Sequence, residues 1–271
     1  MPRFPHGTKH VRRAARFVPC ACNTVVVLSK LFGDPATWPR QDLIAVSEDF
    51  DAQIVVEAYA AGVFPMPVEP SYMGWWSPVQ RGVLPLGRLR ITRSLRQSAK
   101  RYTTTVNRRF GAVLARCADE SREGAWIDRR IADVFTNLHR AGVAHSVETW
   151  DAEGRLVGGL YGVHFGGLFA GESMFHDPAR GRDASKVALL RLALQLHHVS
   201  VSILDVQWLT GHLASMGAVE IPRANYLARL DAVLAQPTQL WEDERLDGPT
   251  LLARLDAVRK PPASGAVHPP T

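Results

Sequence analysis

The spacing of apolar residues along the chain changes its period near residue 143. Helices are expected over 108–119 and 128–140, the second ended by a glycine. From 144 to 175, apolar and polar residues alternate and are broken by glycines, which predicts three antiparallel strands joined by tight turns. The stretch "ASKVALLRLALQLHH" at 184–198 then predicts an apolar helix, and "VSILDVQ" at 201–207 predicts a buried strand.

The segments on either side of this core are less regular. Apolar residues at helical spacing over 54–59, stopped by Gly62, predict one short helix after a run of turns. Residues 68–86 carry Pro, Gly and paired tryptophans, which predicts a loop followed by a strand. A last helix is expected over 223–235.

This order of elements predicts an α+β protein with two domains. A small N-terminal α/β domain is expected at 34–79, against a mixed-sheet domain at 80–235. The basic start and apolar run of residues 1–33 suggest a signal peptide, but Asn23 and Thr24 interrupt the run and no A-x-A cleavage site follows. We therefore expect a basic, disordered extension or a misassigned start codon. Residues 236–271 are expected to form a C-terminal tail with a short charged helix and a frayed, proline-rich end.

The net charge of +6 is unevenly distributed. Residues 1–33 hold six basic residues and no acid, so the rest of the chain is neutral overall. Within that neutral part, residues 81–109 carry nine basic residues and no acid. Arg93, Arg96 and Lys100 share one face of an expected helix, which indicates either a local anion-binding surface or a solvated helix face.

Cysteine and hydropathy patterns exclude several classes of protein. The three cysteines, Cys20, Cys22 and Cys117, lack partners at zinc-binding spacing and do not form a disulfide framework. This sparse set fits a reducing cytoplasm. No stretch reaches the roughly 18 consecutive apolar residues that a membrane-spanning helix needs. We therefore expect a cytoplasmic protein that uses no metal and does not enter a membrane.

Three polar residues stand in apolar surroundings and are the candidates for chemistry. Glu172 lies among small and apolar residues in "FAGESMFHD", where an ionised carboxylate is costly unless it is paired or functional. Asp205 and Gln207 end an apolar strand and point to the same face, because they are two residues apart. Ligands commonly bind at strand ends of mixed sheets, although Asp205 as a turn cap and an exposed Gln207 remain the alternative.

A series of sequence blocks in a fixed order resembles the leucyl/phenylalanyl-tRNA–protein transferase family. The resemblance covers about 34–235 and is most specific in the GESMF and DxQ blocks. The blocks are "GVFPM", "WWSPVQRGVLP", "RSLR", "GAWID", "AHSVETW", "LVGGLYGVHFGGLFAGESMF", "ASKVALL", "LDVQ", "HLASMGAVEIPR" and "YLARL". The resemblance implies transfer of Leu, Phe or Met from charged tRNA to proteins that begin with Arg or Lys, which marks them for degradation. It also implies an acetyltransferase-like (GNAT-like) fold for the larger domain.

The resemblance assigns roles to matching positions. Asp205 and Gln207 match the catalytic pair, with Asp205 either accepting a proton or orienting the other groups. Glu172, Trp126 and Phe135 match residues around the 3′-terminal adenosine of the tRNA. The pocket for the aminoacyl side chain matches Leu160, Phe169, Leu189, Leu192 and Leu204. The basic helix implies contact with the tRNA backbone through Arg93, Arg96, Lys100 and Arg101.

Two departures from the family pattern affect the adenosine site. Met66 stands where the family often has Trp, and Phe135 stands where Tyr is common. Because an aminoacyl ester is already activated, the implied reaction needs no cofactor, only two substrates held together and a stabilised oxyanion.

Two other functions fit parts of the pattern. An acyl-CoA-dependent N-acetyltransferase would share the fold, but "DPARGRDASK" lacks the spacing of a pyrophosphate-binding loop. A non-catalytic RNA-binding module would use the basic face alone.

Overall fold

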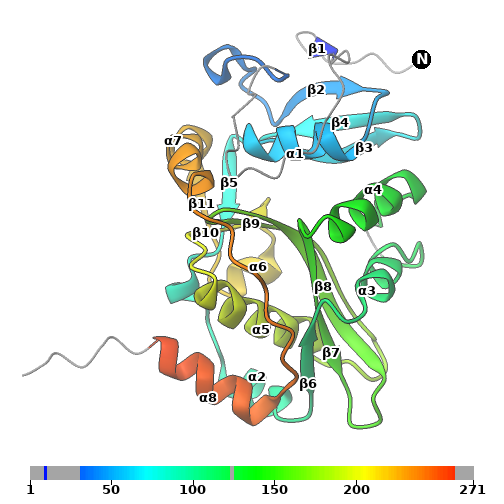
Figure 1. The fold of residues 1–271 in the computed structure, drawn as a ribbon, viewed down its shortest axis with the longest axis vertical. Helices are drawn as coiled ribbons and strands as arrows, with labels where there is room; N and C mark the ends of the chain where they lie inside the picture. The colour runs from blue at the N-terminus through cyan, green and yellow to red at the C-terminus, as the bar shows by residue number, and fades with distance from the viewer. Residues whose placement is uncertain (1–8, 11–30, 123–124, 260–271) are drawn as a thin grey trace, which may run out of the picture.

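The computed structural model describes residues 9–10, 31–122 and 125–259. These residues build two β-sheets, a small one near the N-terminus and a large one that carries most of the helices (Figure 1). No helix within these ranges is long and apolar enough to cross a membrane. Most of the expected basic extension, including Cys20 and Cys22, lies outside the described residues.

The small sheet has four strands in the order β1-β2-β4-β3, with helix α1 packed beside it. Asp51 caps α1 by accepting a hydrogen bond from the backbone of Ile54. Phe32 packs against the buried Trp75, so the small domain includes Phe32, which lies before the expected start at residue 34. The elements are β1 (Lys9–His10), β2 (Leu43–Ser47), α1 (Ala52–Ala60), β3 (Phe64–Glu69) and β4 (Tyr72–Trp76), after a short 3₁₀ helix at Pro35–Thr37.

The large sheet has eight strands in the order β11-β5-β10-β9-β8-β7-β6-β12. It is mixed, because β10 runs parallel to β9 while every other neighbouring pair is antiparallel. The strands are β5 (Gln80–Val83), β6 (Thr103–Val106), β7 (Ala144–Trp150), β8 (Leu156–Phe165), β9 (Leu168–His176), β10 (Ile203–Gln207), β11 (Val219–Pro222) and β12 (Leu246–Asp247). The predicted α+β class and the antiparallel strands β7, β8 and β9 are confirmed.

Helices cover both faces of the large sheet (Figure 1). Helix α5 lies on one face and is itself covered by α2 and α8, which is why nearly all its residues are buried. Helices α3 and α4 cover the other face, and α1 of the small domain packs on α4. The helices are α2 (Arg93–Ala99), α3 (Phe110–Cys117), α4 (Arg129–Arg140), α5 (Ala184–His198), α6 (Gly211–Ser215), α7 (Arg223–Leu234) and α8 (Gly248–Arg259), with a 3₁₀ turn at Leu86–Arg88.

Two expectations from the sequence need correction. The stretch expected to be a loop contains β4, which pairs with β3 in a hairpin. Strand β3 was not expected, because Pro65 and Pro67 are unfavourable in most strands. They are tolerated here because β3 is the edge strand of the small sheet, where proline need not remove a ladder hydrogen bond.

The expected C-terminal tail is ordered over much of its length. Strand β12 pairs with β6 and extends the large sheet, and α8 packs on α2 and α5. Leu251, Leu252 and Leu255 of α8 are buried in the same core as α5. Residues 246–259 therefore belong structurally to the sheet domain rather than to a frayed tail.

Candidate functional site

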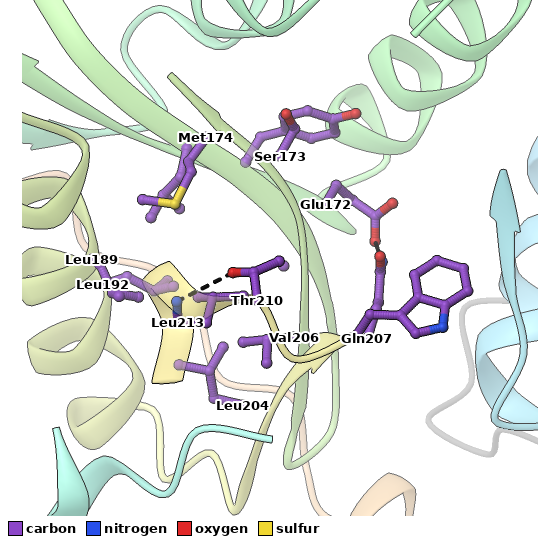
Figure 2. Close-up of a pocket in the computed structure, with 14 residues that line it drawn as sticks. Glu172, Ser173, Met174, Leu189, Leu192, Leu204, Val206, Gln207, Thr210 and Leu213 are labelled. Atoms are coloured by element: carbon purple, nitrogen blue, oxygen red, sulfur yellow. Dashed lines mark hydrogen bonds between the residues drawn. The ribbon is translucent and has the colours of Figure 1, made fainter. Parts of the chain in front are cut away.

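A cavity of about 230 Å³ opens where β8, β9 and β10 meet helices α5 and α6 (Figure 2). Its walls combine leucine side chains from several elements with a small number of polar groups. The lining residues are Leu160, Tyr161, Gly171, Glu172, Ser173, Met174, Leu189, Leu192, Leu204, Val206, Gln207, Trp208, Thr210 and Leu213. A mostly apolar cavity with a few convergent polar groups is the usual form of a small-molecule site.

The apolar end of the cavity is built mainly from leucines. Leu189 and Leu192 come from α5, three residues apart on one helix face, and Leu204 comes from β10. Leu213 reaches the cavity from α6, a short helix that Thr210 caps by accepting a hydrogen bond from the Leu213 backbone at 3.2 Å (Figure 2). This end offers shape and apolar contact to a bound group, with no charge.

The polar end is formed by Glu172 and Gln207, which face each other (Figure 2). The Gln207 side-chain amide donates to Oε1 of Glu172 at 3.0 Å. Tyr59, from α1 of the small domain, donates its hydroxyl hydrogen to the same oxygen at 2.5 Å. The small domain therefore contributes directly to the site.

The second carboxylate oxygen of Glu172 is free. Oε2 is buried and has no hydrogen-bond partner among the described residues. Burial raises the pKa of Glu172 to about 8, against the opposing hydrogen bond from Tyr59. A buried carboxylate with an unused oxygen at a cavity wall is expected at functional sites rather than in structural ion pairs.

Asp205 lies behind Gln207 and is fully buried, with both oxygens occupied. Oδ1 accepts from Nε of Arg81 at 2.9 Å and from the backbone of Gln207 at 2.8 Å. Oδ2 accepts from the terminal guanidinium nitrogen of Arg81 at 2.5 Å and from the hydroxyl of Tyr226 at 2.9 Å. Asp205 is thus the acceptor at the centre of a closed hydrogen-bond network.

Arg81 joins the two domains at this point. Its guanidinium lies over the rings of Phe64 and Tyr226, at 4.8 Å and 4.5 Å from their centroids. It also donates to the carbonyl oxygen of Gly62 in the small domain, at 3.1 Å. Burial lowers the pKa of Arg81, but the adjacent Asp205 carboxylate outweighs burial and leaves that pKa above its ordinary value. Arg81 therefore stays charged and holds Asp205 in place.

The backbone of Gln207 adopts a left-handed conformation, with φ of 65°. This conformation is costly for a residue with a side chain and is maintained only where neighbours enforce it. The Asp205 carboxylate is one such neighbour, since it binds the Gln207 backbone N–H. The register between β10 and β5 also shifts between these two residues, which turns the Gln207 side chain toward Glu172.

The structure brings together most of the site residues expected from the sequence. Glu172 and Gln207 line the cavity, as do the four expected leucines. Asp205 lies directly behind them. Phe169 is fully buried in the same core as the leucines and does not itself line the cavity. The four leucines are Leu160, Leu189, Leu192 and Leu204.

The two aromatic residues expected at the adenosine site lie away from the cavity lining. Phe135 has no exposed surface and packs edge-on against Tyr161 at 5.4 Å between ring centroids. An adenosine has no accessible face of this ring to contact in this structure. Trp126 is half-buried and packs against the core cluster that includes residues of α3 and α4. Tyr161, which does line the cavity, has a buried hydroxyl with no partner among the described residues.

The expected basic face on α2 is only partly free. Arg93, Lys100 and Arg101 are exposed. Arg96 forms a bidentate ion pair with Asp256 of α8, at 2.8 Å and 2.7 Å. Asp256 lies in the C-terminal segment, far in sequence from the acid-free residues 81–109, so no local sequence pattern indicated that it would neutralise Arg96.

Sequence reasoning missed Tyr59, Arg81 and Tyr226. Tyr59 belongs to the apolar stripe of α1, so its spacing indicated packing only. Arg81 was counted within a basic segment, although it is 1% exposed and paired with Asp205. Tyr226 has the helical spacing of a core residue in α7. Within the part of the chain that the structure describes, no group of three His, Cys, Asp or Glu side chains is placed to hold a metal ion.

Comparison with known proteins gives consistent matches over both domains. Residues 83–231 match the leucyl/phenylalanyl-tRNA protein transferase family, and residues 48–79 match the N-terminal domain of that family. A solved structure titled "The structure of L-PGS from Bacillus licheniformis" aligns with a TM-score of 0.35 and 10% identity, over 79% of this chain and 73% of that one. That likeness is too weak to assign the fold.

Curated relatives agree with the family match. A leucyl/phenylalanyl-tRNA–protein transferase of Anaeromyxobacter sp. (strain K) is 43% identical over 212 residues, which cover 76% of this chain and 89% of the relative. The Afipia carboxidovorans protein of the same name is 41% identical, over 77% of this chain and 94% of the relative. The matched residues include both domains that meet at the cavity, and this chain belongs to the leucyl/phenylalanyl-tRNA–protein transferase family.

Proposed function

We propose that this protein transfers Leu, Phe or Met from aminoacyl-tRNA to the N-terminal Arg or Lys of acceptor proteins and so marks them for degradation. The observation that carries the proposal is the cavity, whose apolar end adjoins a carboxylate and a carboxamide. An unbranched apolar side chain fills the leucine-lined end. Its ester bond then lies beside Glu172 and Gln207.

The reaction needs positioning and charge stabilisation rather than an added cofactor, because the aminoacyl ester is already activated. The Gln207 amide gives one N–H to Glu172 and has a second to donate. In the proposed complex, this second N–H binds the ester carbonyl oxygen and stabilises the negative charge that develops on it. Asp205 acts as a positioning residue, since it holds the backbone of Gln207.

The 3′-terminal adenosine lies at the polar end of the cavity in this proposal. Glu172 contacts its ribose, and Trp126 flanks the base. Phe135 supports the ring of Tyr161, which is itself fully buried, and so acts on this end of the cavity only indirectly. The tRNA backbone runs along Arg93, Lys100 and Arg101, with Arg96 contributing less because Asp256 already binds it.

The larger domain is proposed to be a variant of the acetyltransferase fold. Its mixed sheet, with α5 on one face, α3 and α4 on the other, and the cavity at the end of β10, supports this proposal. The proposed place of action is the cytoplasm, where charged tRNA is available.

One experiment separates this function from the alternatives. The purified protein is incubated with radiolabelled Leu-tRNA and a peptide that begins with Arg, and in parallel with labelled acetyl-CoA and the same peptide. The proposal predicts label on the peptide from Leu-tRNA only. Label from acetyl-CoA would favour an N-acetyltransferase, and tRNA binding without any labelled peptide would favour an RNA-binding module.

A further inference from the structure

The proposed transfer requires a group that takes a proton from the attacking amine. A neutral α-amine attacks the ester carbonyl carbon, a C–N bond forms, and the carbonyl electron pair moves to oxygen. The nitrogen must then lose one proton, and the ribose oxygen must gain one as the C–O bond breaks. The acceptor must therefore have a free lone pair next to the ester.

Asp205 does not meet this requirement. Each of its oxygens already accepts two hydrogen bonds, from Arg81, Tyr226 and the Gln207 backbone. Its side chain is fully buried and does not line the cavity. Protonation of Asp205 would also leave the buried Arg81 without its counter-charge, which is strongly unfavourable.

Glu172 has the geometry that Asp205 lacks. Oε1 is bound by Tyr59 and Gln207, which fixes the orientation of the carboxylate. Oε2 has no partner among the described residues, and Glu172 lines the cavity next to Gln207. Oε2 has almost no solvent-exposed surface, and it belongs to a residue of the cavity wall beside Gln207, where the substrate carbonyl is proposed to bind.

We propose that Glu172 is the proton acceptor of the reaction: Oε2 takes the proton from the attacking α-amine and passes it to the departing ribose oxygen. The proton balance closes within one catalytic cycle, because the carboxylate is regenerated when the amide product and the free tRNA form. This inference rests on the proposed function. It gives Glu172 two roles, the contact with the ribose and the proton transfer.

The electrostatic surroundings of Glu172 suit this role. Tyr59 of α1, Tyr161 of β8, Arg81 of β5 and Asp205 of β10 are the titratable groups that act on it. Burial dominates and brings the pKa of Glu172 to about 8. An ordinary α-amine has a pKa of about 7.7–8.0, so proton transfer between the two groups is nearly balanced. General bases work best when their pKa is close to the operating pH.

The test is the pH dependence of kcat/KM for an Arg-peptide, measured between pH 6 and pH 9 with spontaneous ester hydrolysis subtracted. The active form needs both Glu172 and the α-amine deprotonated, and the raised pKa of Glu172 keeps it protonated at low pH. The logarithm of kcat/KM should therefore rise with a slope of about 2 below pH 7 in the wild-type protein. A single titrating amine gives a slope of about 1.

Glu172→Gln keeps the shape and both hydrogen bonds to Oε1, so the fold should be retained. It should lower kcat by about 10²-fold or more and reduce the slope to about 1. Glu172→Asp should be slow but keep the steeper slope. The matched control is Glu57→Gln, a half-buried glutamate on α1 that hydrogen-bonds Gln53 and should change neither quantity.

A wild-type slope of about 1, or a Glu172→Gln protein within a few-fold of wild-type kcat, would overturn the inference while leaving the transferase function intact. Absence of transfer by the wild-type protein at every pH would instead contradict the proposed function itself.

Discussion

The buried pair of Arg81 and Asp205 makes a quantitative prediction about stability. Their side chains are 1% and 0% exposed, so bulk solvent does not reach their contact. Asp205→Asn keeps the size and can still accept from the Gln207 backbone, but it removes the charge that balances Arg81. Breaking one side of a buried ion pair costs about 3–5 kcal/mol, because an uncompensated charge remains in the interior.

This loss is large relative to the roughly 5–15 kcal/mol that stabilises a folded protein. With a urea m-value of about 3 kcal/mol/M, near the top of the usual range for a small protein, the unfolding midpoint should fall by about 1 M or more. The assay is urea unfolding followed by tryptophan fluorescence and circular dichroism. Agreement of the two probes checks that the transition is two-state.

Two further variants show whether the charge is responsible. Asp256→Asn breaks the ion pair with Arg96 on the surface, where both partners are more than a third exposed, and should cost less than about 1 kcal/mol. Adding Arg81→Met to Asp205→Asn removes the stranded cation and should recover part of the lost stability. An Asp205→Asn protein as stable as Asp256→Asn would refute this reasoning.

Three other predictions concern transfer. The double variant Arg93→Glu, Lys100→Glu should weaken tRNA binding and flatten its dependence on salt, whereas Arg129→Glu, at an exposed position of α4, should do neither. Equal salt slopes in titrations of the wild-type protein, the double variant and Arg129→Glu would exclude a tRNA contact by α2. Leu192→Trp should fill part of the cavity and shift competition between Leu-tRNA and Phe-tRNA toward Leu; an unchanged product ratio would place the side chain elsewhere. Gln207→Ala should lower kcat by about 10²–10³-fold through loss of the oxyanion donor, and near-normal turnover would contradict that role.

The large sheet was predictable where apolar residues recur along an element with a regular period. The glycine-broken alternation over 144–175 predicted strands β7 to β9, and the expected helix at 184–198 coincides with α5. The hairpin of β3 and β4 was hidden, because prolines suppress the strand pattern and only its position at a sheet edge makes them tolerable. Helix α8 was underestimated, since its burial depends on α2 and α5, which are remote in sequence.

The site was partly predictable for a similar reason. Glu172 and Gln207 stood out, because polar residues are unexpected in an apolar strand context. Tyr59 and Arg81 did not, since a tyrosine in a helix stripe and an arginine among other basic residues look ordinary in sequence. Their roles arise from contacts with Glu172 and Asp205 that span more than 100 residues of chain. Pairings over such separations are set by the tertiary fold and have no local signature.

The central claim is that the cavity joins an aminoacyl group to a free α-amine. The most direct measurement is a single-turnover reaction of the protein with radiolabelled Leu-tRNA and an Arg-peptide, followed by sequencing of the labelled peptide from its N-terminus. We expect labelled leucine to be released in the first cycle, ahead of Arg, and N-acetylation of the peptide to abolish labelling. Release of free leucine without labelled peptide, or label that persists on the acetylated peptide, would show that the protein does not join an aminoacyl group to a free α-amine.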